Sequence, residues 1–424
     1  MNVSKLQITQ ASKNVSNEIK FIPIVESNRN TKKLVDLPPV DTIVRTLHQL
    51  VKDNNPLNFK IMMTNLCNLS CSYCFQQHSK NTIPWTVEGL TLVLDGLIAA
   101  FPHRRIQWDW FGGEPLIYIN VILEFIKKNK DKLNGSNVSF ELSTNGTLLT
   151  HEFIQEFYSV ANSHIAVSLD TVWLENDNRN LTKDSLTKIL TTLHAISTVG
   201  GVYSSNVTIT LSRDQVQTLY HTLTFIYKMG GRNISVNPLV YDNDTLVDWS
   251  QDELNEIATI LTAVANEHKD IHLDYGTEVV SKESINCLVG ERMLSIDGSG
   301  DITGCFSLSN DKDSFTDTTM GNIFTGKINH NIHRFDDVSS DFLSIDPRCN
   351  TCDYSNLCTM CPVGVHRTSR GTLYFKSNSS CQTIVKNYIR IRDLMITQNI
   401  PHRQNTIKKY NDNQRYMETS NESI

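Results

Sequence analysis

The 424-residue sequence has no excess of positive charge and no long apolar run. Lysine and arginine total 39 against 45 acidic residues, which gives a formal net charge of −6. A protein that binds nucleic acid or an anionic membrane over its whole surface needs the opposite balance, so we expect neither partner. The longest apolar stretch, residues 90–101, is interrupted by Asp95 and is too short to span a bilayer.

The N-terminal residues also lack the apolar segment and the small-residue cleavage site of a secretory signal peptide. We therefore expect a cytoplasmic protein, in which thiols stay reduced and can serve as metal ligands. The ten cysteines are too few for a disulfide-dense secreted scaffold of this length. Three of them fall between residues 67 and 74 and four between residues 349 and 361, and such clustering points to metal.

From residue 57 onward, β-rich runs alternate with helical patterns, and a further helix is predicted ahead of them at 41–52. Six strands each followed by a helix indicate an α/β fold with a parallel sheet and right-handed crossovers, as an open sheet or an incomplete barrel. The strands are predicted near 59–65, 106–111, 138–143, 164–170, 206–212 and 233–240, and the helices near 87–100, 119–132, 151–162, 183–199, 215–229 and 251–268.

The alternation stops at about residue 276, where Gly, Ser, Asp and Asn become frequent and cysteines reappear. This composition predicts a second, small domain that is ordered by metal rather than by a large core. The resulting division is an N-terminal extension over 1–56, the βα domain over 57–275, the cysteine-rich domain over 276–400 and a polar, disordered tail over 401–424.

The first cysteine cluster, Cys67, Cys71 and Cys74, comes directly after the first predicted strand. Loops at the carboxyl ends of parallel strands are where such folds place their chemistry. Three thiolates can hold three irons of a [4Fe–4S] cube and leave the fourth iron open to a ligand. The alternative is a structural zinc loop, but zinc prefers four ligands in paired CxxC spacing.

This CxxxCxxC spacing, with the aromatic Tyr73 before the last cysteine, resembles the signature of the radical SAM enzymes. The resemblance implies an incomplete (β/α)6 TIM barrel over roughly residues 57–240. It also implies that the open iron binds S-adenosylmethionine, and that one electron from the cluster releases a 5′-deoxyadenosyl radical that abstracts a hydrogen atom.

Two motifs at later strand ends resemble segments that contact the cofactor in that family. Gly112, Gly113 and Glu114 follow the second strand and resemble the GGEP motif, and Ser143 and Asn145 lie in an STNG segment at the end of the third. The alternative for each motif is an ordinary turn.

The fourth strand ends in a Ser-x-Asp segment, Ser168 to Asp170, and Arg179 follows nine residues later. The resemblance places the serine and the aspartate near the ribose and the arginine near the methionine carboxylate, which a guanidinium fork suits. The family often has His-Asp ahead of that arginine, whereas this sequence reads Asn176-Asp177-Asn178. The alternative for Arg179 is a solvated loop charge.

Seven cysteines remain, and alone their CxxC pairs suit zinc about as well as iron–sulfur. Beside the first cluster they resemble the SPASM extension of radical SAM enzymes, which binds one or two auxiliary [4Fe–4S] clusters. The resemblance assigns four to a complete cluster and three to one that lacks a cysteine ligand, although the last CxxC gap is two residues where the family usually has three. The first set is Cys349, Cys352, Cys358 and Cys381, and the second is Cys287, Cys305 and Cys361.

SPASM enzymes mostly modify peptides or proteins, so the resemblance implies a maturase that forms carbon–carbon or ether crosslinks between side chains of a ribosomally made precursor peptide. An electron donor such as a flavodoxin or a ferredoxin is a further expected partner. Size and motif order resemble the cyclophane-forming, darobactin-type crosslinkers. We also expect the leader of the precursor to pair with a strand edge near residues 59–63 or 21–25.

Two other functions stay open. A formylglycine-forming sulfatase maturase is disfavoured, because that group carries an aspartate where this sequence has Phe306, directly after Cys305. The other alternative is a non-catalytic metal-binding scaffold.

Overall fold

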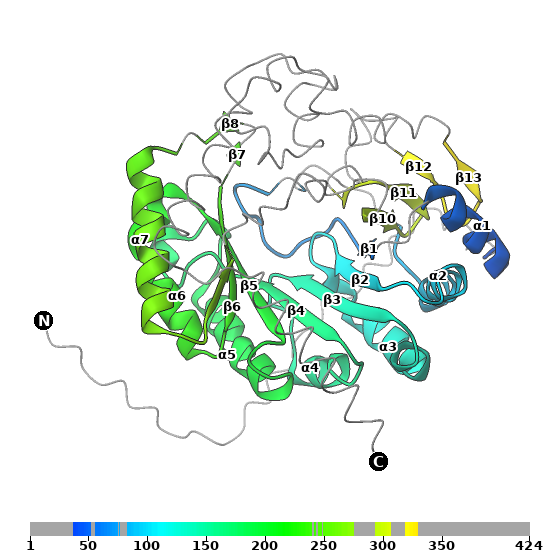
Figure 1. Cartoon of the computed structure of the whole chain (residues 1–424), viewed down its shortest axis with the longest axis horizontal. Helices are drawn as coiled ribbons and strands as arrows, with labels where there is room; N and C mark the ends of the chain where they lie inside the picture. Colours follow the sequence, from blue (N-terminus) through cyan, green and yellow to red (C-terminus); the bar gives the residue numbers. More distant parts are fainter. Residues whose placement is uncertain are drawn as a thin grey trace, which may run out of the picture. The chain divides into compact units, whose positions relative to one another are not determined.

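A parallel sheet runs through the βα part of the protein, and its helices lie along one side of it (Figure 1). The computed structural model describes residues 37–51, 56–74, 76, 83–239, 241–242, 245–247, 249–274, 293–306 and 319–329. The parallel strands are β1 Leu57–Met62, β2 Ile106–Phe111, β3 Val138–Thr144, β4 Ser163–Ser168, β5 Ser205–Leu211, β6 Asn233–Pro238 and β9 His272–Asp274.

The sheet continues on the other side of β1, in the order β13-β12-β11-β10-β1-β2-β3-β4-β5-β6-β9. Strand β10 pairs parallel to β1, and the next three strands follow it antiparallel. These strands are β10 Met293–Asp297, β11 Asp301–Thr303, β12 Thr319–Asn322 and β13 Lys327–Ile328, and a separate two-stranded ribbon pairs β7 Tyr241–Asp242 with β8 Thr245–Leu246.

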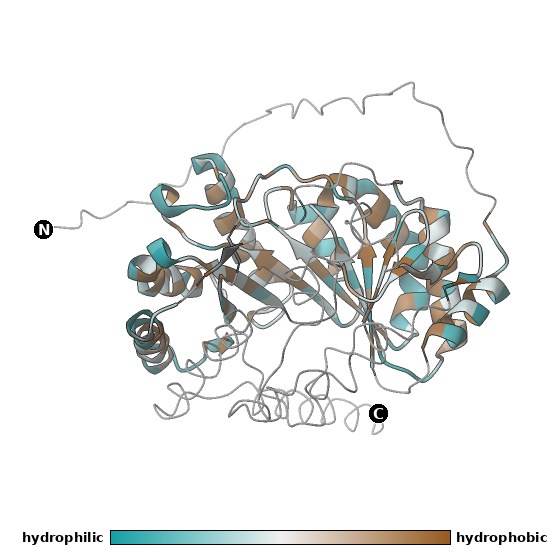
Figure 2. Cartoon of the chain, turned by 90° about the horizontal axis from the view of Figure 1, so that it is seen from above, coloured by the Kyte–Doolittle hydropathy of each residue, from teal (hydrophilic) through white to brown (hydrophobic). Residues whose placement is uncertain are grey.

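The helices cover the outer side of this row of strands (Figure 1). Each carries both apolar and polar residues, as Figure 2 shows, which is expected of helices with one face on a sheet. They are α1 Val40–Leu50, α2 Val87–Ala100, α3 Ile119–Asn134, α4 His151–Phe157, α5 Lys183–Val199, α6 Leu219–Lys228 and α7 Gln251–Glu267, with short 3-10 turns η1 Pro115–Tyr118, η2 Leu174–Asn176 and η3 Arg213–Thr218.

The two faces of the sheet differ in chemistry. On β2, Trp108 and Trp110 face the helices and pack against Phe125 of α3, with ring centroids 5.4 and 5.3 Å away. The alternate residue Asp109 faces the opposite, inner side, where it forms an ion pair with Lys60 of β1. Because strand side chains alternate between faces, the apolar core lies between sheet and helices and a polar lining is left inside.

The predicted strands and helices of the βα part are confirmed, several to the residue. Two differences have physical reasons. The predicted helix 151–162 ends at Phe157, and the backbone then turns through Asn162 in the left-handed region (φ +57°). The predicted helix 215–229 begins as the 3-10 turn η3, where Ser212 and Gln215 form a capping box.

The strands beyond residue 270 were not predicted, because each is short. The predicted boundary at residue 275 falls between β9 and β10, and the sheet continues across it through β1. The expectation that residues 59–63 offer a free strand edge is wrong, because β1 is paired on both sides, to β10 and to β2. Residues 21–25 lie outside the described part. No helix within the described residues is long and apolar enough to cross a bilayer.

Candidate functional site

The three clustered cysteines lie on one loop after β1, at the carboxyl end of the parallel strands. None of the three forms a disulfide: Cys67 is exposed, Cys74 half-buried and Cys71 buried. Burial raises the pKa of Cys67, and it raises the pKa of Cys71 to about 11, although the positive charge of Arg179 opposes this rise. Thiols with raised pKa values become thiolate ligands when a bound cation supplies the compensating charge.

The three cysteines provide the donors that an iron–sulfur cluster takes. In a [4Fe–4S] cube each thiolate binds a different iron, so three thiolates on one loop can hold three of the four irons. The donor set of Cys67, Cys71 and Cys74 therefore fits the cluster that the spacing predicts.

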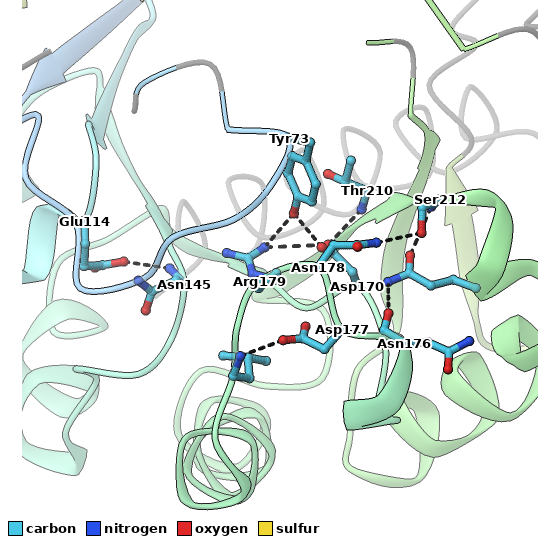
Figure 3. A network of polar contacts seen from close by, with 12 residues as sticks. Tyr73, Glu114, Asn145, Asp170, Asn176, Asp177, Asn178, Arg179, Thr210 and Ser212 are labelled. Atoms are coloured by element: carbon cyan, nitrogen blue, oxygen red, sulfur yellow. Dashed lines mark hydrogen bonds and ion pairs between the residues drawn. The ribbon is translucent and has the colours of Figure 1, made fainter. Parts of the chain in front are cut away.

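Glu114 braces the ends of β2 and β3. Its carboxylate is fully buried and accepts three hydrogen bonds, from the backbone N–H of Leu116 (3.0 Å), the hydroxyl of Thr144 (2.7 Å) and the backbone N–H of Asn145 (2.8 Å). Burial raises its pKa, and these donors offset part of that rise. Figure 3 shows the link from Glu114 to Asn145.

The side chain of Asn145 extends this brace to the cysteine loop. Its amide nitrogen lies 2.9 Å from Oδ1 of Asn68 and 3.8 Å from Sγ of Cys67. Its Oδ1 accepts hydrogen bonds from the backbone N–H and the hydroxyl of Thr147. The brace thus runs from Glu114 to a candidate cluster ligand.

A second network joins the cysteine loop to the end of β4 (Figure 3). The Tyr73 hydroxyl donates to the buried carboxylate of Asp170, which also accepts the backbone N–H of Thr210 at 3.0 Å. A guanidinium nitrogen of Arg179 lies 3.6 Å from the same carboxylate and 3.5 Å from the Tyr73 hydroxyl. Burial raises the pKa of Asp170, while the positive charge of Arg179 lowers it.

Arg179 is therefore not a solvated loop charge. Its side chain is 9% exposed, and its Nε has no hydrogen-bond partner within the described structure. A buried donor without a partner has a high cost unless a ligand satisfies it, and a carboxylate suits a guanidinium.

The paired glycines let the β2 loop lie directly on the cysteine loop. The N–H of Gly113 donates to the carbonyl of Thr64 at 2.7 Å. A Cβ at Gly112 would lie 2.3 Å from that same carbonyl oxygen, and Gly112 has a φ of +136°. A side chain does not fit here, so these glycines are required for close backbone approach.

The remaining predicted site residues are two serines at strand ends and the seven cysteines of the second set. Ser143 faces the inner side of the sheet, with its hydroxyl 3.4 Å from the Asp109 carboxylate, and Ser168 is half-buried at the end of β4. Cys305 is buried after β11, and its neighbour Phe306 packs on Phe111 with ring centroids 4.6 Å apart. The other six cysteines of the second set, Cys287, Cys349, Cys352, Cys358, Cys361 and Cys381, lie outside the described residues.

Sequence reasoning missed the ion pair of Lys60 with Asp109. The Lys60 ammonium also lies 4.8 Å from the ring centroid of Phe111 and 5.4 Å from that of Phe306. One signal was available: an aspartate between two tryptophans in an otherwise apolar strand. It also missed Asn178 and Asn180, which contact the cysteine loop through Ser72 and Ser70.

Comparison with known proteins agrees with this geometry. Residues 61–226 match the family model of the radical SAM superfamily. Fe-coproporphyrin III synthase of Methanosarcina barkeri is 31% identical over 152 residues, which are 35% of this chain and 35% of that protein. The chain spans between 35% and 40% of the length of the curated relatives it matches.

Two solved structures share the fold. The structure of anSMEcpe with bound AdoMet superposes with a TM-score of 0.59 at 14% identity and covers 81% of this chain and 97% of that one. Streptococcus suis SuiB bound to the precursor peptide SuiA gives a TM-score of 0.58 at 13% identity, covering 81% and 79%. With the match of the family model and the cysteine loop on the strand ends, residues 61–226 of this chain form a radical SAM domain.

Proposed function

We propose that this protein is a radical SAM maturase that crosslinks side chains of a ribosomally made precursor peptide. The observation that carries the proposal is the meeting of four strand ends at one site. The cysteine loop after β1 contacts Asn145 after β3, Asn145 contacts Glu114 after β2, and Tyr73 of the loop contacts Asp170 after β4. The radical SAM family binds a [4Fe–4S] cluster and S-adenosylmethionine, for which this site provides both thiols and polar contacts.

Cys67, Cys71 and Cys74 would hold the cluster, which together with S-adenosylmethionine supplies a 5′-deoxyadenosyl radical when both are bound. The Nε–H of Arg179 would donate to the methionine carboxylate, with Asp170 and Tyr73 holding the guanidinium in place. Gly112 and Gly113 would let the β2 loop lie against the backbone that leads into the cysteine loop, next to the cluster.

Support for a peptide substrate comes from the neighbouring fold and from the sheet. SuiB, which shares the fold, is described bound to a precursor peptide. The inner face of the sheet carries polar groups from neighbouring strands, among them Lys60, Asp109 and Glu141. A peptide backbone has many donors and acceptors to satisfy, and a polar lining can meet them. Crosslinking of the darobactin type is our proposal for the bond formed.

The auxiliary clusters belong to the same proposal. Cys305 would contribute to a cluster with Cys287 and Cys361, and Cys349, Cys352, Cys358 and Cys381 would hold another. The Cys305 loop reaches the end of β2 through the contact of Phe306 with Phe111. A cluster there would lie on the same side as the cysteine loop and could take up the second electron of the crosslink. A cytoplasmic flavodoxin or ferredoxin would supply the first electron.

Formylglycine formation fits less well. The residue after Cys305 is Phe306, whose ring is packed on Phe111 and under the Lys60 ammonium, so this position offers no carboxylate base. We therefore place this activity behind peptide crosslinking.

The test is anaerobic reconstitution of the full-length protein with iron, sulfide, dithionite and S-adenosylmethionine. The reconstituted protein is incubated with the short peptide encoded beside its gene, and the products are analysed by mass spectrometry. The proposal predicts 5′-deoxyadenosine together with a peptide that has lost two hydrogen atoms per crosslink. Formation of 5′-deoxyadenosine with a peptide of unchanged mass would contradict the crosslinking proposal but leave the radical chemistry standing. A zinc-loaded protein without iron would contradict both.

A further inference from the structure

The residues between the three cysteines are held by hydrogen bonds and packing contacts with the rest of the protein. Asn68 donates to the hydroxyl of Thr147 at 2.7 Å and accepts from the amide of Asn145 at 2.9 Å. Leu69 packs against the apolar core. The shape of the loop therefore depends on contacts that need no metal.

The second half of the loop is held from the β4–α5 side. The side-chain amide of Asn180 donates to both the carbonyl and the hydroxyl of Ser70, at 2.7 and 3.0 Å. The carbonyl of Asn178 accepts the backbone N–H of Ser72 at 2.9 Å. These two contacts lie on either side of Cys71, the buried thiol.

The β4–α5 segment is itself fixed to the next βα unit, as Figure 3 shows. The side chain of Asn178 donates to the Ser212 hydroxyl at 2.8 Å, and that of Asn176 donates to the carbonyl of Asp214 at 2.8 Å. In return, Gln215 donates to the carbonyl of Asn176 at 2.7 Å. The contacts to Ser70 and Ser72 thus come from a segment that is itself hydrogen-bonded to residues 212–215.

The backbone of Asn180 explains the residue type. Its φ is +57°, in the left-handed region that asparagine tolerates better than most residues. This conformation accompanies the double contact of its amide with Ser70. Glycine would also fit the backbone but would bring no donor.

We propose that Asn180 is a positioning residue that, with the carbonyl of Asn178, shapes the cysteine loop for its cluster before the cluster is inserted. When the loop is already ordered in the metal-free protein, iron binding does not have to offset the entropy cost of ordering it. The three thiols therefore bind iron more readily. The inference rests on the proposed assignment of Cys67, Cys71 and Cys74 as cluster ligands.

The test compares the full-length protein with N180D and N180G. The aspartate keeps the size of the asparagine side chain but loses the amide N–H that donates to Ser70, and the glycine loses this donor without adding a charge. Asn162 provides the matched control N162D, because it is exposed and has the same φ of +57° but lies ahead of β4, at the opposite end of the sheet. Two readouts are needed: hydrogen–deuterium exchange of residues 66–76 in the metal-free protein, and the electron paramagnetic resonance signal of the reduced cluster after limited reconstitution.

We expect about tenfold faster exchange of this peptide in N180D and N180G, since each loses a two-acceptor contact. We also expect about half or less of the wild-type signal of this cluster, taken as the part of the signal that is lost when Cys67, Cys71 and Cys74 are replaced by alanine, and no change in N162D. Wild-type exchange in both Asn180 variants would overturn the inference, and so would faster exchange without any loss of cluster signal. If replacing Cys67, Cys71 and Cys74 together leaves the electron paramagnetic resonance signal unchanged, the assignment of these cysteines as cluster ligands is wrong. This outcome is distinct from a failure of the role proposed for Asn180.

Discussion

The buried carboxylate of Glu114 gives the sharpest prediction about how the site is held together. Replacing Glu114 by alanine leaves the backbone N–H groups of Leu116 and Asn145 without an acceptor, while the Thr144 hydroxyl can rotate. Each buried N–H without a partner costs about 1–3 kcal/mol, and the loss of a buried charge offsets part of the sum. We therefore expect E114A to lower the free energy of local opening at the end of β3 by about 3 kcal/mol.

Hydrogen–deuterium exchange of residues 140–150 measures this free energy directly. A loss of about 3 kcal/mol corresponds to exchange that is faster by roughly two orders of magnitude. The more conservative E114Q keeps one acceptor oxygen but turns an amide N–H toward that of Asn145, so an effect of about 1–2 kcal/mol is expected. Glu152 on α4, whose side chain is 78% exposed, supplies the control E152Q.

The same experiment tests whether the brace reaches the cysteine loop. Because Asn145 contacts Cys67, E114A should also speed exchange at residues 66–70. Exchange within about threefold of wild type at both segments in E114A, equivalent to well under 1 kcal/mol, would refute the bracing role. Faster exchange at residues 140–150 alone would show that the brace ends at β3.

Three further predictions concern the inner face, the glycine turn and the tyrosine. Burial raises the pKa of Asp109, although the positive charge of Lys60 opposes this rise, so the carboxyl is protonated more readily in the folded state than in the unfolded state. Wild type should therefore lose stability relative to D109N as pH rises above about 4, and parallel urea-stability curves for the two proteins would contradict this. G112A should lower the free energy of unfolding in urea by more than about 2 kcal/mol, because the new Cβ would clash with a carbonyl oxygen. The control G201A also has a positive φ but no atom within 4 Å of the new Cβ, so it should cost about 1 kcal/mol. Equal losses in the two variants would show that backbone strain alone causes the destabilisation. Y73F removes the hydroxyl that donates to Asp170 and should weaken S-adenosylmethionine binding to the reconstituted protein about tenfold in equilibrium dialysis. Unchanged binding would show that the Tyr73 hydroxyl does not contribute to the cofactor site.

The βα part of the fold could be predicted from sequence because its signals are local. Strand β2 alternates large apolar residues with Gln107 and Asp109, and helix α5 begins at a threonine cap, Thr182. Such patterns depend on the residues within one element. The pairing of β10 with β1 depends instead on residues far apart in the sequence, such as Phe59 and Leu294, and strands as short as β10 and β11 carry little pattern of their own.

The site shows the same division. The cysteine spacing and the GGEP segment could be read directly, and the structure brings Asn145, Glu114 and the cysteine loop together. What could not be read is which polar groups pair with one another. Nothing in the sequence says that the Glu114 carboxylate accepts backbone N–H groups, or that Asn180 contacts Ser70, because these contacts join loops that meet only in the folded protein.

The measurement that tests the central claim most directly is the formation of 5′-deoxyadenosine by the anaerobically reconstituted protein with dithionite and S-adenosylmethionine. The assay compares wild type with a variant in which Cys67, Cys71 and Cys74 are replaced by alanine. We predict product from wild type, none from the variant, and about four fewer irons per variant molecule. Absence of 5′-deoxyadenosine from iron-loaded wild type with its three cysteines intact, or equal amounts from both proteins, would contradict the assignment of this loop as the catalytic cluster site.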